Sequence, residues 1–297
     1  MSSPLTFLRR QLERLGEKIE FHCDPCDRTS SPVHEIAIVA IVKNEARNLE
    51  EWIEFHDVVG VSHFYIYDNG STDDTAAVLA PYVRRGLVTY QPWPDFSSWN
   101  GQCAAYAHAV QCYRQLVRWM VFLDADEFMF PRSGSLQAAL SNHAGCASIR
   151  LPWRCFGHSG HRRRPPGLVI ENFTERCASA DPAVRKVKSI VDPCKVETIH
   201  VHAAVVAGDA VNIADDILLN HYVLKSEEDF EAKLRRGYRY KGSGTSQRRR
   251  RRLEHLRDLV ESDTTEDLEI ARYVQKVKHN IWLKSRPKPV LLAAAGA

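Results

Sequence analysis

The chain has 297 residues, a net charge of +3, 44% hydrophobic and 26% charged residues. These values are ordinary for globular proteins, so they exclude a fibrous or intrinsically disordered chain. The length favours one large domain with appendages. No run of about 18 apolar residues occurs, so the sequence predicts no membrane-spanning helix.

The first 130 residues alternate between strand-like and helix-like patterns. The β-branched run at residues 36–42 predicts a strand buried on both faces. The elements expected after it are a helix with Leu49, Trp52 and Ile53 on one side, a strand over 63–67, a helix over 75–84, a strand over 87–90, a helix from Gly101 and a strand over 119–123. This alternation predicts an α/β fold with an open, mostly parallel twisted sheet flanked by helices.

The pattern is less regular beyond residue 145. Strand-like pieces at 147–151, 168–170 and 199–206 predict a smaller second half-sheet, and residues 226–280 predict helices broken at 241–244. The domains expected are an N-terminal helical extension (1–34), a central α/β domain (35–225, divided into halves at 35–130 and 131–225) and a C-terminal helical region with a tail (226–297).

Polar clusters follow three predicted strands, and in such sheets ligands bind outside the carboxyl ends of the strands. The clusters are Lys43-Asn44-Glu45, residues 68–74 and Asp124-Ala125-Asp126-Glu127. Asp124 and Asp126 stand two apart, so in an extended turn both carboxylates can face one magnesium or manganese ion, with a diphosphate completing the shell. Such a pair alone is more often a turn or a helix cap, but its place after an apolar strand favours the metal site.

Four segments together resemble the successive motifs of the GT-A glycosyltransferases, most closely the family-2 and family-92-like group. They are residues 36–45, 67–73 and 119–128, and residues 220–226 followed by Glu228, Phe230, Lys233 and Arg236-Gly237. The resemblance implies a GT-A type fold and transfer of a sugar from a nucleotide-sugar donor, a UDP-sugar, to a glycan or lipid-linked acceptor. It also implies a divalent metal, manganese or magnesium, and a catalytic domain at 35–225 with a nucleotide-sugar half at 35–130 and an acceptor half at 131–225. The transfer is expected to be inverting, which needs a carboxylate base near the acceptor hydroxyl, whereas a retaining transfer does not.

The resemblance also implies roles for individual residues. Val42, Asn44 and Glu45 are expected to border the nucleoside, and Asp68 to meet the base or ribose. Gln102 and Tyr106 lie where a helix approaches the donor. Asp124 and Asp126 are expected to hold the metal and diphosphate, with Asp126 taking part in catalysis, and Lys188 and Lys225 to bind the phosphates.

Two roles have competing candidates. The resemblance implies a third metal ligand, usually a histidine, for which His202 and His221 compete. His202 is preferred because the family pattern and its place at a strand end agree. Glu171 is the candidate catalytic base, and Glu127 and Asp181 are its alternatives.

Three other functions compete with the transferase. A nucleotidyltransferase also uses paired acids, but it favours a glycine-rich phosphate loop that this sequence lacks. A non-catalytic nucleotide-sugar-binding protein remains open. The basic runs at 162–164 and 248–252 are more simply solvated surface than a nucleic-acid site, so no nucleic-acid partner is expected.

The cellular location is predicted from the cysteines and the N-terminus. Eight cysteines without the apolar core of a signal peptide indicate a reducing compartment, the cytoplasm. Leucines and arginines at helical spacing in residues 5–19 leave peripheral contact with a membrane open.

Overall fold

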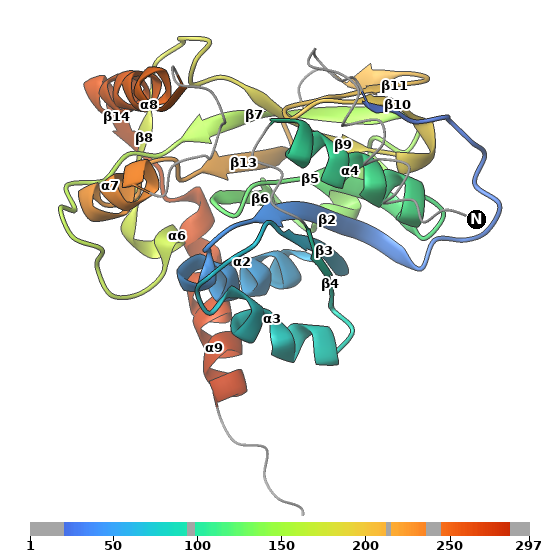
Figure 1. Cartoon of the computed structure of the whole chain (residues 1–297), viewed down its shortest axis with the longest axis horizontal. Coiled ribbons are helices and arrows are strands. Elements are labelled where there is room, and N and C mark those ends of the chain that lie inside the picture. The colour runs from blue at the N-terminus through green and yellow to red at the C-terminus, as the bar shows by residue number, and fades with distance from the viewer. Residues whose placement is uncertain (1–20, 94–98, 212–214, 236–244, 286–297) are drawn as a thin grey trace, which may run out of the picture.

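A mixed sheet runs through the middle of the molecule, and helices cover both of its faces (Figure 1). The structure is a computed structural model that describes residues 21–93, 99–211, 215–235 and 245–285. Within these residues the strand order is β4-β3-β2-β5-β9-β7-β13-β6, with β12 beside β7.

The strands of the central sheet are β2 (His34–Val42), β3 (His63–Asp68), β4 (Val88–Pro92), β5 (Val117–Phe122), β6 (Glu127–Pro131), β7 (Ser148–Cys155), β9 (Val187–Val191), β12 (Ala210–Val211) and β13 (Ile217–His221). Two small sheets contain β1 (Phe21–His22), β10 (Val196–Ile199) and β11 (Ala204–Val206), and β8 (Glu175–Cys177) and β14 (Thr264–Glu266). The helices are α2 (Ala46–Val59), α3 (Thr75–Arg84), α4 (Trp99–Tyr113), α5 (Leu136–Ser141), α6 (Val169–Asn172), α7 (Glu227–Arg235), α8 (Thr245–Ser262) and α9 (Val274–Ser285), with 3-10 turns η1 (Pro193–Lys195) and η2 (Glu269–Tyr273).

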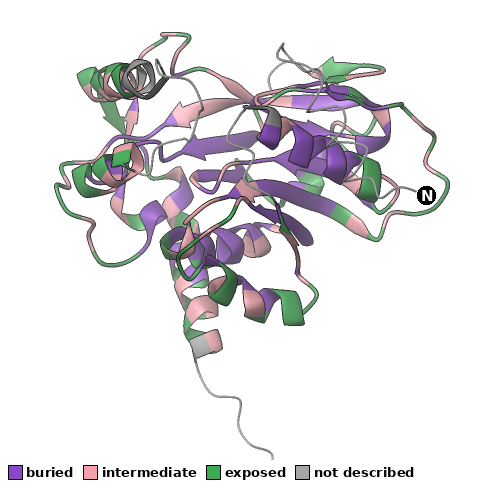
Figure 2. Ribbon diagram, in the orientation of Figure 1, coloured by how far each residue is buried: buried purple, intermediate pink, exposed green. Residues whose placement is uncertain are grey.

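The strand β2 is buried on both faces, as its continuous apolar sequence predicts. Ile36 and Ile38 lie in one core with residues of α2, α3 and α9. Ala37 and Val39 point to the opposite face and lie in a second core with residues of α4, β10 and β11. Figure 2 shows the resulting buried band along the sheet. Because a core covers each face of the sheet, the carboxyl ends of the strands are where ligands are expected to bind in a fold of this kind.

The two halves of the sheet differ in strand direction. β2, β3, β4 and β5 are parallel neighbours, whereas β9 runs antiparallel to both β5 and β7, and β6 runs antiparallel to β13. The predicted α/β fold is confirmed: the sheet is open and mostly parallel, helices flank it, and a mixed second half continues it.

Two predicted strands beyond residue 145 are wrong. Residues 169–172 form the short helix α6, because the buried Glu51 carboxylate accepts hydrogen bonds from the backbone N–H groups of Val169 and Ile170. Residues 199–206 form a hairpin instead of one strand, because the His200 N–H donates to the Ala203 carbonyl and closes a turn between β10 and β11.

The ends of the chain fit the predicted boundaries in part. The predicted helix at 5–19 and the break at 241–244 lie outside the described residues. Residues 21–33 contain the strand β1 and no helix. The described C-terminal helices pack on the body, α9 against α2 and α8 against β8. Over the described ranges no helix is long and apolar enough to cross a membrane.

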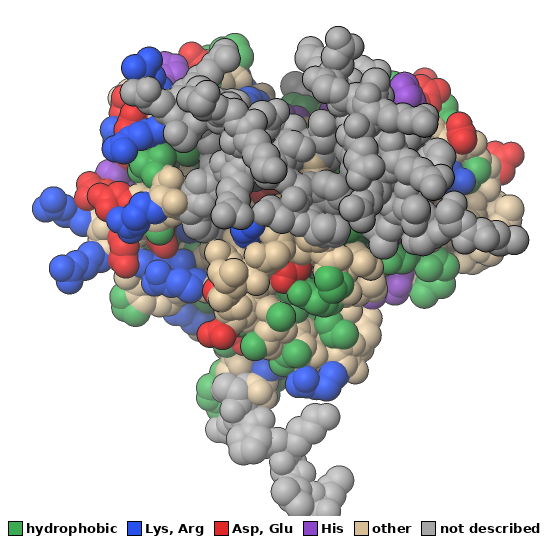
Figure 3. All heavy atoms as spheres, viewed as in Figure 1, with side chains coloured by type: hydrophobic (Ala, Val, Ile, Leu, Met, Phe, Trp, Pro, Cys, Tyr) green, Lys and Arg blue, Asp and Glu red, His purple; other side chains and the backbone are tan. Residues whose placement is uncertain are grey.

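The basic run at 162–164 is interleaved with acids. Arg162 pairs with Glu227, and Arg164 pairs with Asp229. On the face shown in Figure 3, the Lys and Arg side chains near α7 alternate with Asp and Glu side chains. The described residues on this side of the molecule therefore present mixed charge.

Candidate active site

The acidic segment forms the turn between β5 and β6. The Glu127 N–H donates to the Asp124 carbonyl (3.0 Å), and the Asp124 N–H donates to Glu127 Oε2 (2.8 Å). From α2, Trp52 Nε1 donates to the Glu127 carbonyl (2.7 Å). These bonds fix the turn at the carboxyl edge of the sheet, on the side where α7 lies (Figure 1).

A fully buried lysine lies behind this turn. Lys188 Nζ is 3.0 Å from Asp124 Oδ2 and 3.4 Å from Glu127 Oε2. Burial alone would lower the pKa of Lys188, but Asp124 and Glu127 raise it well above its ordinary value. Burial raises the pKa of Glu127 to about 8, so its carboxyl is mostly protonated at neutral pH. The charged pair at this point is therefore Lys188 with Asp124.

The other oxygen of Asp124 is held from α4. Gln102 Nε2 donates to Asp124 Oδ1 (2.9 Å) and to the Tyr106 hydroxyl (2.8 Å). Tyr106 is completely buried, so it fixes the amide. The sequence placed Gln102 and Tyr106 beside the donor, and the structure joins them to the acid turn.

Asp126 faces α7 and the end of β13. Lys233 Nζ donates to Asp126 Oδ2 (2.8 Å), and His221 Nε2 lies 3.5 Å from Asp126 Oδ1. Burial alone would raise the pKa of Asp126, but Lys233 and His221 hold it well below its ordinary value. Asp126 is therefore an ionised carboxylate that joins three segments distant in sequence.

The two candidate histidine ligands have different surroundings. His221 ends β13 and contacts Asp126, while His202 lies in the turn between β10 and β11, where its ring packs edge-on against Trp153 at 5.3 Å. Burial lowers the pKa of His221, although Asp126 acts in the opposite direction. A neutral imidazole is the form that binds metal. The geometry favours His221, which reverses the preference drawn from the sequence.

The ammonium group of Lys225 is a further positive charge near Asp126. Lys225 is buried and has a left-handed backbone (φ 57°). Burial lowers its pKa, while the charges of Asp126 and Glu45 act in the opposite direction. Among the residues that the structure describes, its ammonium makes no hydrogen bond or ion pair.

The ends of β2 and β3 form the neighbouring part of the edge. Val42 pairs with Asp68 across the two strands. Asp68 Oδ1 accepts from the Ser71 N–H (2.8 Å), and Oδ2 accepts from the Tyr90 hydroxyl (2.7 Å). Asn44 has a left-handed backbone (φ 54°), which turns the chain after β2.

Side chains of the two loops then join these strand ends. Asn44 Oδ1 accepts from the Thr72 N–H (2.7 Å), and Glu45 Oε2 accepts from Asn48 (2.6 Å). The four residues predicted to border the nucleoside (Val42, Asn44, Glu45 and Asp68) are thus brought together.

The candidate base Glu171 is directed elsewhere. Glu171 Oε1 accepts from Lys278 of α9 (2.6 Å), and that bond lowers the pKa of the carboxyl. Its hydrogen bonds and ion pairs reach neither Asp124 nor Asp126. Its alternative Glu127 is completely buried under the turn, and the carboxylate of Asp181 accepts from the nearby Ala183 N–H (2.7 Å). The role of base stays a prediction.

The side chains at the acid turn fit a divalent cation. Two ligands about 2.1 Å from a metal and at right angles are about 3.0 Å apart, close to the 3.5 Å between Asp126 Oδ1 and His221 Nε2. Carboxylate oxygens with one imidazole suit manganese or magnesium. Among the described residues no three His, Cys, Asp or Glu side chains already surround one point. Asp126 and His221 are therefore the pair around which a cation fits.

The fold and the order of its acidic turns are those expected of a glycosyltransferase. Residues 36–269 match the model of glycosyltransferase family 92, and the chain belongs to this family. It is 32% identical over 212 residues to a glycosyltransferase family 92 protein of Oryza sativa subsp. japonica, covering 68% of this chain and 35% of that protein. It is 29% identical over 170 residues to galactan beta-1,4-galactosyltransferase GALS2 of Arabidopsis thaliana, covering 52% of this chain and 33% of that protein.

Among solved structures, residues 1–349 of S. aureus TarS superpose with a TM-score of 0.40 and 11% identity, covering 68% of this chain and 63% of that one. The chain spans about 35% to 42% of the length of the first curated relatives.

Sequence reasoning assigned no role to two residues that the structure brings to the site. Lys233 was noted only as part of the C-terminal motif, although its position seven residues after Ser226 was a usable signal. The Ser226 hydroxyl accepts from the Asp229 N–H (3.1 Å), so a helix starting there carries Lys233 back towards β13. Tyr90 carried no such signal, because its contact with Asp68 depends on the pairing of β3 with β4.

Proposed function

We propose that the chain transfers a sugar from a UDP-sugar to a glycan or lipid-linked acceptor with the help of manganese or magnesium. One observation carries the proposal: at the carboxyl edge of the sheet, Asp124 pairs with Lys188, and Asp126 pairs with Lys233 and lies 3.5 Å from His221. A departing nucleoside diphosphate gains negative charge in the transition state, and fixed cations stabilise it there.

Each side chain has a distinct part in binding the donor. When bound, a divalent cation at Asp126 and His221 neutralises charge on the leaving diphosphate. Lys225, which has no ion-pair partner among the described residues, binds a phosphate oxygen directly. Lys233 moves from Asp126 to the diphosphate. Gln102 and Lys188 hold Asp124 in one orientation throughout.

The proposal extends to the nucleoside site and to the stereochemistry of the transfer. Asp68 and Asn44 hold the base and ribose at the ends of β2 and β3. The Arabidopsis relative is named for a beta-1,4 linkage, and forming a β-linked product from an α-linked UDP-sugar inverts the anomeric carbon. We therefore propose an inverting displacement.

The test is sugar transfer and slow donor hydrolysis with a panel of UDP-sugars, measured with manganese and after chelation. We expect UDP release that depends on metal, and an at least hundredfold lower kcat for Asp126→Asn. Asp258→Asn, an exposed acid on α8, is the matched control and keeps full activity. UDP release that is unaffected by Asp126→Asn would refute the role proposed for Asp126.

The same assay separates the alternatives. A nucleotidyltransferase releases pyrophosphate from a nucleoside triphosphate instead of UDP from a UDP-sugar. A non-catalytic binding protein binds UDP without turnover in any condition. The cytoplasmic location and the peripheral membrane contact stay predictions.

A further inference from the structure

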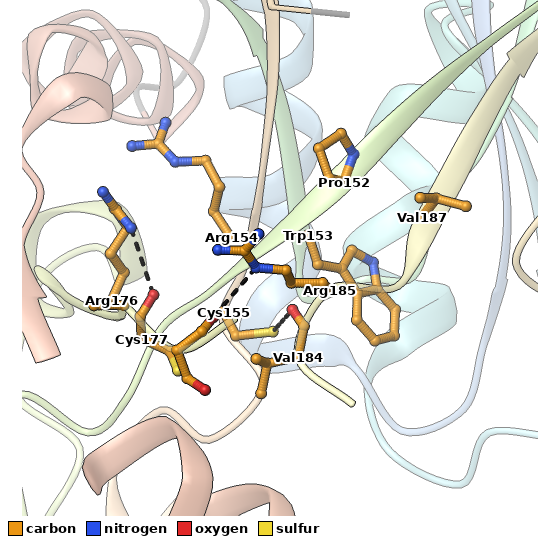
Figure 4. A pocket seen from close by; sticks show the side chains of 11 residues that line it. Pro152, Trp153, Arg154, Cys155, Arg176, Cys177, Val184, Arg185 and Val187 are labelled. Carbon is orange, nitrogen blue, oxygen red and sulfur yellow. Dashed lines mark hydrogen bonds between the residues drawn. The ribbon is translucent and has the colours of Figure 1, made fainter. Parts of the chain in front are cut away.

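A pocket of about 350 Å³ lies along the end of β7, and Figure 4 shows side chains that line it. The lining residues come from β7, from β8 and from the segment that leads into β9. They include Trp153, Arg154, Cys155, Arg176, Val184 and Arg185. The volume lies within the range of about 300 to 1,000 Å³ that small-ligand pockets show, and a mostly apolar wall with a few polar groups is typical of them.

His221 separates this pocket from the acid turn. The Trp153 ring lies 4.2 Å from the His221 ring, and Cys155 Sγ lies 4.0 Å from His221 Nδ1. The other nitrogen of the same ring faces Asp126. A sugar held at Trp153 is therefore one imidazole ring away from the place proposed for the diphosphate. This is where an acceptor must lie.

Two hydrogen-bond donors of the lining residues have no acceptor. Trp153 Nε1 and Arg154 Nη1 are buried, and neither has a hydrogen-bond partner among the described residues. The other terminal nitrogen of Arg154 pairs with Asp267 and Glu269, so the guanidinium cannot turn away. Buried donors without acceptors are unfavourable, and a ligand rich in oxygen satisfies them. The Trp153 ring itself is in contact with the ring of His221 (4.2 Å), and the Lys186 ammonium lies 5.8 Å over it, so the indole offers its N–H rather than a free face.

The lining also carries unbalanced positive charge. It contains three arginines and, over the described ranges, no Asp or Glu. Asp267 pairs with Arg154 and Arg176 from behind the wall. The exposed Arg185 has no carboxylate partner in the described parts of the chain, and its Nε donates only to the Ser179 carbonyl (3.3 Å). Its guanidinium is thus available to an anionic group, which it can hold with two parallel hydrogen bonds.

We infer that this pocket is the acceptor subsite and that it selects a sugar residue bearing an anionic group, a carboxylate or a phosphate. The inference rests on the proposed transferase function and adds the class of its acceptor. Arg185 binds the anionic group, and the two unmatched donors, Trp153 Nε1 and Arg154 Nη1, bind ring or hydroxyl oxygens.

The experiment compares acceptors that differ only in charge. Each reaction contains the purified full chain, a UDP-sugar, manganese and one acceptor. The three acceptors are a hexuronic acid oligosaccharide, its carboxyl-reduced neutral counterpart, and a neutral oligosaccharide with one sugar phosphate. We expect kcat/KM at least tenfold higher for one of the anionic acceptors than for the neutral one. Arg185→Gln lowers that ratio about tenfold, whereas Arg185→Lys retains most of it. Arg84→Gln, an exposed arginine on α3, leaves the ratio unchanged.

Two binding measurements distinguish a wrong assignment of the pocket from a wrong assignment of the transferase function. Direct binding of a fluorescent hexuronate oligosaccharide without donor reports on the pocket alone, and UDP binding by calorimetry reports on the donor site alone. Trp153→Phe, which keeps a ring but loses Nε1, weakens oligosaccharide binding and leaves UDP affinity within twofold. Oligosaccharide binding weakened by Arg185→Gln in a chain that transfers nothing supports the pocket and overturns the transferase. Equal use of charged and neutral acceptors, with or without Arg185, overturns the inference.

Discussion

Replacement of Lys188 by methionine tests the charge arrangement under the acid turn. The ammonium lies 3.0 Å from Asp124 Oδ2 and is completely buried, while the Asp124 side chain is 33% exposed. At an effective dielectric constant of about 20, unit charges at this distance attract by roughly 5 kcal/mol. Methionine removes that attraction, but it also removes the cost of burying an ammonium, and water reaches part of Asp124. We expect Lys188→Met to lower the free energy of unfolding by about 3 kcal/mol.

The assay is urea unfolding at pH 7, followed by circular dichroism, with the purified chain free of metal. The double variant Lys188→Met with Asp124→Asn should recover more than half of the loss, because it removes the carboxylate that the single variant leaves unpaired. Glu127→Gln should cost less than about 1 kcal/mol, because its carboxyl is mostly protonated at this pH (pKa about 8) and glutamine has the same shape. Lys276→Met, on the exposed side of α9, is the control and should change stability by less than about 0.5 kcal/mol.

Two results would refute this reasoning. One is a Lys188→Met variant as stable as the parent chain, which would mean that the ion pair contributes nothing. The other is a double variant less stable than the single one, which would mean that Asp124 depends on partners other than Lys188.

Three more predictions concern separate contacts. Tyr90→Phe should destabilise the fold by about 1 kcal/mol in urea unfolding, because Asp68 loses a hydrogen bond of 2.7 Å. His221→Gln should weaken manganese binding at least tenfold, measured by electron paramagnetic resonance of free Mn²⁺, whereas His202→Gln should not. Burial raises the pKa of Glu51 from 4.5 to about 7, so the folded chain holds more protons than the unfolded chain between these values. Relative to Glu51→Gln, the parent should therefore lose about 3 kcal/mol of stability as pH rises from 4.5 to 7.

Each of these has a contrary outcome. Equal pH profiles for the parent and Glu51→Gln would mean that Glu51 is ionised in the fold throughout the range. If His202→Gln and His221→Gln weakened manganese binding equally, His202 would also have to be a metal ligand. An unchanged Tyr90→Phe variant would show that Asp68 is held by its backbone contact alone.

The fold of residues 35–130 was predictable because its signals are local. A β-branched run such as residues 36–42 predicts a strand buried on both faces, and β2 is such a strand. Each acid cluster follows its strand directly in the sequence. The second half depends on distant pairing. Residues 169–172 have the apolar character of a strand, but Glu51, more than a hundred residues earlier, binds their N–H groups and holds them in a helix.

The site was predictable to the same extent. Asp124, Asp126 and Asp68 were identified from their place after strands. Lys233 and Tyr90 lacked an assigned role, because their contacts depend on how α7 docks and on which strand lies beside β3. His221, not His202, lies beside Asp126. His202 lies in a hairpin turn at residues 200–203, which the sequence pattern did not predict.

The contacts of Asp126 also bear on how the protein is made. Its carbonyl accepts from the Tyr222 N–H (2.9 Å), and its carboxylate pairs with Lys233. These partners emerge from the ribosome about a hundred residues after the acid turn itself. A nascent chain that ends before β13 has the turn but neither the histidine nor the lysine opposite it. The contacts around Asp126 are therefore complete only late in synthesis, after β13 has inserted between β7 and β6 and α7 has docked.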